Sequence, residues 1–78
     1  MTKDDLTFGG RAVGLTFNPG SNPTVNAIKG QFADVIDNLN DLRTESTDQE
    51  EKRMLSIAIT EAQTAQMWAL KAVTWNTK

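Results

Sequence analysis

The sequence contains no cysteine and no histidine, and both absences narrow the chemistry open to the chain. Without cysteine there is no disulfide, and no thiolate can bind a metal or attack a substrate. Without histidine the chain lacks the commonest metal ligand and the commonest general acid or base. We therefore expect no metal and no cofactor, and catalysis is poorly supported. The absence of cysteine also fits a reducing compartment.

Long apolar runs and an excess of positive charge are missing as well. No stretch approaches the roughly 20 apolar residues of a membrane span, and MTKDDLTFGG at the N-terminus lacks the apolar core of a signal peptide. The net charge is −2, whereas a protein that binds duplex DNA needs a basic face. We expect a cytosolic protein that binds neither membrane nor duplex nucleic acid. The charge does not exclude binding of a small anionic ligand, because such a ligand needs only a few cations.

The length of the chain bounds its fold. Its 78 residues suit one small domain, residues 1–78. A domain this short buries only about 60% of the surface that its unfolded chain exposes, and disulfides, a metal or oligomerisation usually support it. Since disulfides are excluded and the best metal ligands are missing, we expect a homo-oligomer.

Turn-forming residues concentrate in residues 1–22, which hold four of the five glycines and show no helical periodicity. We predict an extended, glycine-rich arm there. The alternation of Val13, Leu15 and Phe17 is also compatible with a short strand. A lone strand is unstable in water, so we expect the arm to lie on another part of the protein.

A first helix is predicted over residues 23–44. Asn22 suits the N-cap, and Pro23 suits the first helical position. The apolar positions that recur by threes and fours are Val25, Ile28, Phe32, Val35, Ile36, Leu39 and Leu42. Gly30 interrupts this helix at a cost of about 1 kcal/mol relative to alanine. Either that cost is tolerated, or something approaches the helix backbone there.

A second helix is predicted over residues 47–75, with Thr47 and Glu50 forming a capping box. The fold class that follows is all-α: an antiparallel two-helix hairpin with an extended N-terminal arm. A seam of small residues lets another helix come close, at Ala58, Ala62, Ala65, Ala69 and Ala72. The apolar residues outnumber what one interface can cover. Those left for other copies or a ligand are Met54, Ile57, Met67, Trp68 and Trp75.

Residues suited to catalysis are poorly arranged. No pairing of a nucleophile with a base follows from the spacing of the Ser, Thr, Asp, Glu and Lys residues. Asp34, Asp37 and Asp41 share a helix face and could hold a hard cation, but a solvated acidic face is the expected interpretation. The glycines of GGRAVG lack the GxGxxG spacing, so a dinucleotide fold is not predicted.

Cations within the apolar helices favour ligand binding. Trp68, Lys71 and Trp75 share one helical stripe, and Lys29 and Arg53 also lie among apolar residues. Each cation can instead extend its head group to water, and the tryptophans can pack in a core or interface. Aromatic faces with cations suit a nucleotide, however, because bases stack on them and Lys or Arg neutralises phosphate.

Further donors for an anion lie in the arm. Asn18 and the glycine backbone can donate hydrogen bonds, and the helix that begins at Pro23 presents its positive end to an anion.

The helical stretches resemble a known family. RMLSIAITEAQTAQMWALKAVT resembles the second hairpin helix of the phage-encoded signal sponges that counter CBASS and Thoeris immunity, and NPTVNAIKGQFADVIDNL is similar to their first helix. The resemblance covers roughly residues 11–76. It rests on the arm, the IK near the start of the first helix, an arginine opening the second helix, and the MW…K ending.

The resemblance also implies roles for residues. Lys29 matches the family's phosphate-facing lysine, Arg53 an arginine at the head of the second helix, and Lys71 a basic position near its end. Members that bind cyclic dinucleotides carry an aromatic GYR in the arm, where this chain reads GGRAVG and has no tyrosine. The expected ligand-binding residues are Lys29, Arg53, Lys71, Arg11, Phe8, Phe17 and Asn18.

The resemblance implies a sponge and not an enzyme. Such proteins assemble from helical hairpins, often as hexamers, and bind cyclic di- or trinucleotides or cyclic ADP-ribose isomers without cleaving them. This chain would then act in the cytoplasm of an infected bacterium, with its ligands between copies. The rival interpretation is a small helical oligomer that binds a host or virion protein through its Trp and Met face.

Overall fold

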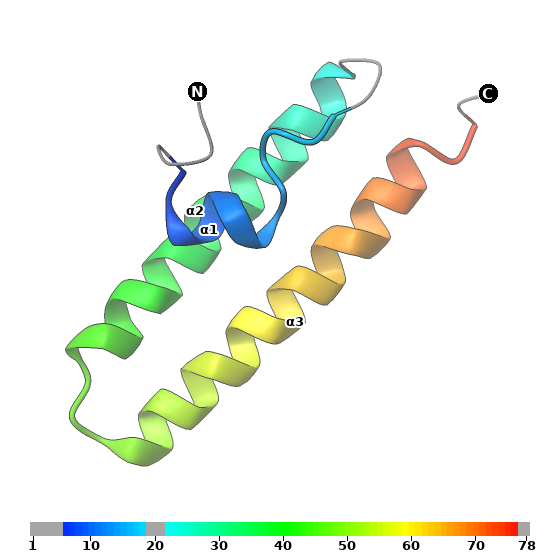
Figure 1. Cartoon of the computed structure of the whole chain (residues 1–78). Helices are drawn as coiled ribbons and strands as arrows, with labels where there is room; N and C mark the ends of the chain where they lie inside the picture. The colour runs from blue at the N-terminus through cyan, green and yellow to red at the C-terminus, as the bar shows by residue number, and fades with distance from the viewer. Residues whose placement is uncertain (1–5, 19–21, 77–78) are drawn as a thin grey trace.

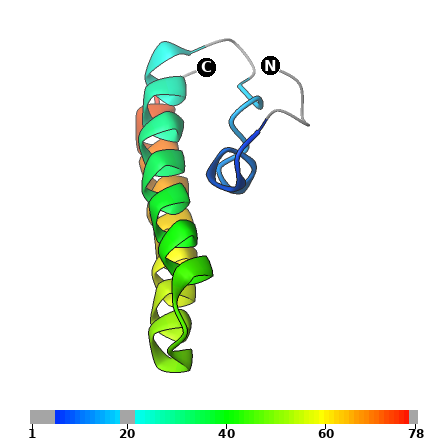
Figure 2. The ribbon, with the colours of Figure 1, turned by 90° about the vertical axis from the view of Figure 1, so that its left-hand side faces the viewer.

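The computed structural model describes residues 6–18 and 22–76. Within these residues the chain is all-helical, without a strand: α1 (Phe8–Ala12), α2 (Pro23–Glu45) and α3 (Gln49–Val73). α2 and α3 run antiparallel as a hairpin, and α1 packs on α2 (Figure 1). The arm that carries α1 lies on one side of the hairpin (Figure 2). The predicted all-α class and the helical hairpin are confirmed.

α2 begins where its cap residues predict. The side chain of Asn22 accepts hydrogen bonds from the N–H groups of Thr24 and Val25, at 2.9 and 3.4 Å, and Pro23 follows as the first helical residue. The helix ends at Glu45, one residue beyond the predicted range. At Gly30 an added Cβ would meet no atom within 4 Å beyond the backbone of its own helix turn, so no contact with the other described residues requires glycine there.

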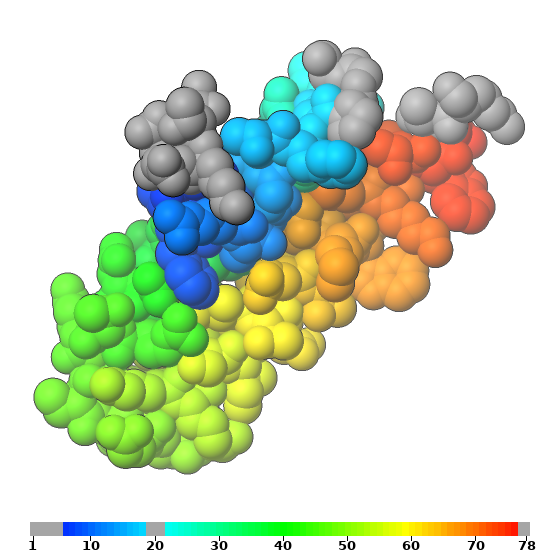
Figure 3. Space-filling view, viewed as in Figure 1, coloured from blue at the N-terminus to red at the C-terminus, as the bar shows by residue number. Residues whose placement is uncertain are grey.

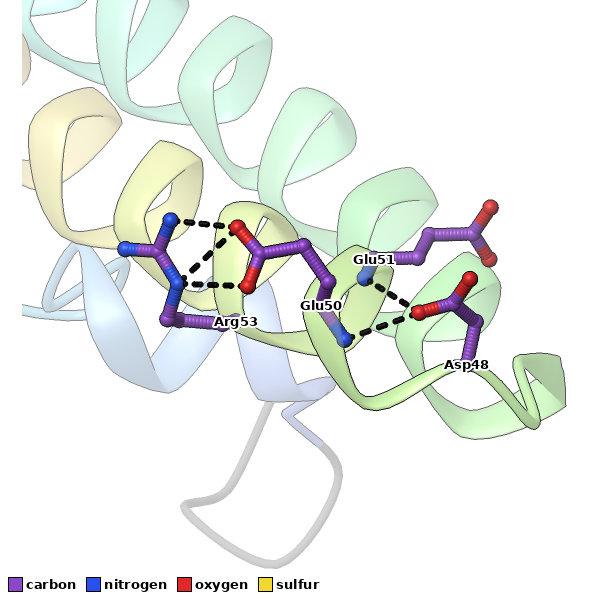
Figure 4. A network of polar contacts seen from close by, with 4 residues as sticks. All are labelled: Asp48, Glu50, Glu51 and Arg53. Atoms are coloured by element: carbon purple, nitrogen blue, oxygen red, sulfur yellow. Dashed lines mark hydrogen bonds and ion pairs between the residues drawn. The ribbon is translucent and has the colours of Figure 1, made fainter.

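The N-cap of α3 lies one residue later in the sequence than predicted. The N-cap is Asp48 and not Thr47, because the Asp48 carboxylate accepts from the N–H groups of Glu50 and Glu51, at 2.8 and 3.2 Å (Figure 4). A carboxylate at this position also suits the positive end of the helix dipole. The capping box is wrong as well, since the side chain of Glu50 pairs with Arg53. α3 ends at Val73, short of residue 75.

Between residues 6 and 18 the arm is not extended, and this is the main correction to the predicted fold. α1 has an N-cap, Thr7, whose side chain accepts from the N–H of Gly10. Gly14 ends the helix with a φ of +64°. Its N–H donates to the carbonyl of Arg11, and that of Leu15 donates to the carbonyl of Gly10, the two bonds of a Schellman motif. The alternation of Val13, Leu15 and Phe17 is therefore a helix end and a turn, and not a strand.

The core is small and lies where the arm and both long helices meet. Its buried members come from all three places: Val13, Ala33, Ile36 and Ile59. Figure 3 shows the arm covering one part of the hairpin and leaving the rest of this face open. Many large apolar side chains are exposed in the single chain, among them Val35, Leu42, Met54, Ile57, Met67, Trp68 and Trp75.

None of the helices in the described ranges combines the length and the apolar character that crossing a membrane requires.

Candidate functional site

The arm is held against α2 by a close backbone contact at Gly9. Its N–H donates to Oδ1 of Asp37 at 2.6 Å. A Cβ at this position would overlap the carbonyl oxygen of Ala33 and lie 2.9 Å from Oδ1 of Asp37. Only glycine fits this contact, and the expected solvated acidic face is wrong for Asp37, whose carboxylate anchors α1.

Lys29 provides a second link between the arm and α2. The residue is only 4% exposed, and its Nζ donates to the carbonyl oxygen of Gly14 at 2.8 Å and to that of Phe17. The ammonium also lies 5.5 Å from the centre of the Phe17 ring. Burial lowers the pKa of Lys29, because a low-dielectric environment disfavours the charged form. Two predicted site residues, Lys29 and Phe17, are thus brought together.

Asn18 joins the end of the arm to the start of α2. Its amide nitrogen donates to the carbonyl of Asn22 at 2.9 Å and to Oδ1 of Asn26 at 2.8 Å. Its side-chain oxygen accepts from the N–H of Asn22 at 3.3 Å. This predicted ligand residue therefore lies next to Lys29 and Phe17 in the fold, with its hydrogen bonds used to shape the arm.

The other aromatic residue of the arm, Phe8, faces a cation that the sequence analysis missed. The guanidinium of Arg43 lies 5.5 Å from the centre of the Phe8 ring. Arg43 also donates to Oδ1 of Asn40 at 2.8 Å and to Oγ of Ser56 at 3.0 Å. It therefore links α1, α2 and α3. The spacing of Asn40 and Arg43 on one helix could have indicated the first bond, but the bonds to other elements have no sequence signal.

Trp68, Lys71 and Trp75 form an exposed stripe on α3 and the turn that follows it. The Lys71 ammonium lies 5.4 Å from the Trp68 ring centre and 6.0 Å from that of Trp75. The two indoles are 66% and 72% exposed. Such an arrangement is a cation–π sandwich with free aromatic faces. The predicted clustering of these side chains is present, and it lies on a surface that α2 does not cover.

Two arginines complete the predicted set. Arg53 lies near the hairpin turn and pairs with Glu50, its Nε donating to Oε2 at 3.0 Å (Figure 4). This pairing raises the pKa of Arg53 and lowers the pKa of Glu50. Arg11 is exposed on α1, and its guanidinium makes no hydrogen bond or ion pair with the residues that the structure describes. Arg53 is at the opposite end of α3 from Lys71, so one chain does not unite all the predicted cations.

The arrangement as a whole is suited to binding. Exposed aromatic rings, cations beside them and backbone amides recognise a ligand with planar bases and negative charges. The residues fall into three places: the arm and the start of α2, the Trp–Lys stripe, and the hairpin turn. A ligand that needed all three would have to touch more than one copy of the chain.

Comparisons with known proteins identify a family. No curated protein and no solved structure matches the chain. The family model of the Acb2/Tad1 hairpin domain matches residues 11–74, which include α2, α3 and the second half of the arm. Because this match spans most of the chain, the protein belongs to the Acb2/Tad1 hairpin family, the sponges that counter CBASS and Thoeris defence.

Proposed function

We propose that this protein binds a cyclic nucleotide second messenger and sequesters it without cleaving it, so that a CBASS or Thoeris effector is not activated. The family match over residues 11–74 carries this proposal, because the family consists of sponge-type binding proteins and not of enzymes. The site of action is the cytoplasm of an infected bacterium. The ligand classes are cyclic di- or trinucleotides and cyclic ADP-ribose isomers.

The arm supplies groups that such a ligand needs. The Phe17 ring is 71% exposed and offers a face on which a base can stack, and Phe8 offers a second, partly exposed ring. Arg11 is an exposed cation on the same arm, and its guanidinium can neutralise a phosphate. Lys29 and Asn18 complete this group of residues.

The remaining cations support binding between copies. Lys71 and Arg53 lie toward opposite ends of α3, so they reach a common ligand only if chains meet. Gln63, whose side-chain nitrogen lies 3.5 Å from the carbonyl oxygen of Ala12, marks the side of α3 that faces the arm. Ala65 is two residues, or about 200°, further around the helix, and it is exposed. We propose that this bare side packs on another copy in a homo-oligomer, with a hexamer as the expected state.

Native mass spectrometry with a ligand panel tests the proposal. The purified protein is mixed with cyclic di- and trinucleotides and cyclic ADP-ribose isomers, and each linear counterpart is the matched control. We expect one cyclic class to bind the oligomer and to raise its melting temperature. When the protein is then denatured, the ligand should be released chemically unchanged. A ligand at 100 times its Kd adds about 2.7 kcal/mol of stability. Binding by none of the cyclic compounds, or release of a cleaved product, would contradict the proposal.

The exposed Trp and Met residues favour one alternative function, a helical adaptor for another protein. An adaptor needs the same apolar surface but no anion. For an adaptor, Trp68→Ala would abolish binding of the partner protein, and no cyclic nucleotide would change the melting temperature of the wild-type protein. A ligand-dependent melting temperature in the wild-type protein decides against the adaptor.

A further inference from the structure

The side-chain amide of Asn18 has its orientation fixed by the backbone of Asn22. Its oxygen accepts from the N–H of Asn22 at 3.3 Å, and its nitrogen donates to the carbonyl of Asn22 at 2.9 Å. A backbone N–H can only donate and a backbone carbonyl can only accept, so the amide of Asn18 fits in one orientation. Its nitrogen also donates to Oδ1 of Asn26 at 2.8 Å. Asn26 therefore has to present its oxygen to Asn18.

The same hydrogen bonds fix what Asn26 offers to a ligand. Because its Oδ1 faces Asn18, its nitrogen, which carries two N–H groups, is not used in this contact. Asn26 is exposed, and its nitrogen makes no hydrogen bond with the residues that the structure describes. The start of α2 thus carries an oriented donor beside the arm.

Gly30 lies one helical turn beyond Asn26, on the same face of α2. An added Cβ there would meet no atom within 4 Å beyond the backbone of its own helix turn. Glycine destabilises a helix interior relative to alanine, and no contact with the other described residues requires it at this position. Glycine does allow a ligand to approach the backbone closely. Gly30 therefore leaves bare helix surface next to the donor of Asn26.

Asp34 follows one turn later on this face and supplies the opposite chemistry. It is exposed, and its carboxylate makes no hydrogen bond or ion pair within the described part of the chain. A carboxylate repels phosphate but accepts from N–H groups. The eight residues from Asn26 to Asp34 rise about 12 Å, which a base with a hydrogen bond at each end can span. This face thus runs from a donor, over bare backbone, to an acceptor.

We infer that Asn26, Gly30 and Asp34 form a recognition strip for a guanine base, and this inference rests on the proposed cyclic nucleotide binding. Asn26 donates to O6 of guanine, the base crosses Gly30, and the carboxylate of Asp34 accepts from N1–H and the N2 amino group. Adenine has an amino group in place of O6 and an acceptor at N1, so both ends of the strip would face it with the wrong group. The phosphates are left to the cations of the proposed site.

Paired ligands that differ only in their bases test the recognition strip. Isothermal titration calorimetry compares cyclic di-GMP with cyclic di-AMP, and likewise cyclic trinucleotides in which guanine replaces adenine. We expect the wild type to bind the guanine member of a pair at least about tenfold more tightly, because adenine leaves a charge-assisted hydrogen bond unmade. An adenine member that binds equally or more tightly, or binding of cyclic ADP-ribose isomers alone, would overturn the inference.

Substitutions at the two ends of the strip should reduce this preference. Asn26→Asp keeps the oxygen that Asn18 bonds and removes both donors, and Asp34→Ala removes the acceptor. Because the paired ligands carry the same charge, the ratio of their affinities separates base recognition from the altered charge of the protein. We expect this ratio to fall about tenfold in each variant, and an unchanged ratio would overturn the inference. Asn38→Asp and Asp41→Ala, exposed on the same helix, are the matched controls and should keep the wild-type ratio.

Gly30→Ala should change stability and binding in opposite directions. In the ligand-free protein the better helix former should raise the melting temperature by a few degrees. The methyl group should also fill the space that the base crosses, and weaken binding of the guanine ligand about tenfold or more. Wild-type affinity would overturn the inference, and so would a changed oligomer mass in sedimentation, because Gly30 would then pack on another copy. If the wild type binds none of the cyclic nucleotides, the proposed function is wrong, whereas binding without a guanine preference refutes only the strip.

Discussion

Gly9 shows how much of the arm's position depends on a single missing side chain. The glycine Cα packs directly on the α2 backbone, with its N–H bonded to Asp37. Sequence alone indicates that the arm is glycine-rich, but it does not indicate which glycine touches another element. The neighbouring Gly10 differs, since a Cβ there would meet only side chains, at 3.3 Å or more.

We predict that Gly9→Ala detaches the arm from the hairpin. The added methyl overlaps the carbonyl oxygen of Ala33, so α1 must move away and lose its bond to Asp37. Trypsin should then cleave after Arg11 at least about tenfold faster than in the wild type, as expected for a locally opened segment. Gly10→Ala is the matched control, because flexible side chains can yield to it. Equal cleavage rates for the two variants would contradict this packing.

Lys29 is a second residue whose surroundings could not be predicted from the sequence. The pattern placed a cation among apolar residues, but its partners come from a turn 12 and 15 positions earlier. The resemblance implied a lysine that faces phosphate, and no comparison tests that role. What the structure adds is that the ammonium bonds the arm.

A pH titration measures the burial of Lys29. Because burial lowers its pKa, the amine should lose its proton below the ordinary lysine value of 10.5. Between the lowered pKa and that value the unfolded chain binds more protons, so the contribution of Lys29 to stability rises with pH. NMR of the lysine side chains gives the pKa, and urea unfolding of the wild type against Lys29→Met gives the pH dependence. Titration at or above 10.5 would show an ammonium in contact with water.

At the scale of elements, the sequence predicts the start of α2 correctly, whereas the N-cap of α3 and the short helix α1 were not predicted. The start of α2 follows from Asn22 and Pro23, whose chemistry is local. α1 carries equally local signals, Thr7 as its cap and Gly14 as its stop, but a helix of five residues shows no periodicity, so the glycines were interpreted as an extended arm. Its stability comes from contacts with α2, which are not encoded in the arm alone.

The cap of α3 can be tested by substitution. Asp48→Ala should lower the free energy of unfolding by about 1 kcal/mol, because the N–H groups of Glu50 and Glu51 lose their acceptor. Thr47→Ala should cost clearly less, since its hydroxyl makes no hydrogen bond among the described residues. Chemical denaturation of both variants gives the comparison. A larger loss for Thr47→Ala would restore the predicted capping box.

At the scale of the whole molecule, the single chain has a small core and a large apolar surface. Among the residues that the structure describes, one large side chain, Ile36, is fully buried, whereas the tryptophans and two methionines are exposed. This imbalance was predictable from the count of apolar positions on two helices. The sequence does not show which side the arm covers, because that depends on contacts of Gly9 and Lys29.

Assembly is tested at Ala65. The residue is exposed in the single chain, so Ala65→Leu should leave the hairpin itself folded. In a close-packed interface the larger side chain costs about 1–3 kcal/mol per site, and it should dissociate the oligomer. Sedimentation gives the mass, with circular dichroism confirming helix content. An oligomer of wild-type mass would place Ala65 outside the interface, and a wild-type monomer would refute assembly itself.

The location of the tryptophans has a practical consequence. The protein has two tryptophans and no tyrosine, and both tryptophans belong to the exposed stripe beside Lys71. Intrinsic fluorescence therefore reports on whatever covers that stripe and hardly on the hairpin core. If the emission shifts to the red on dilution before the helix content falls, the oligomer dissociates before its chains unfold. The measurement needs no attached dye.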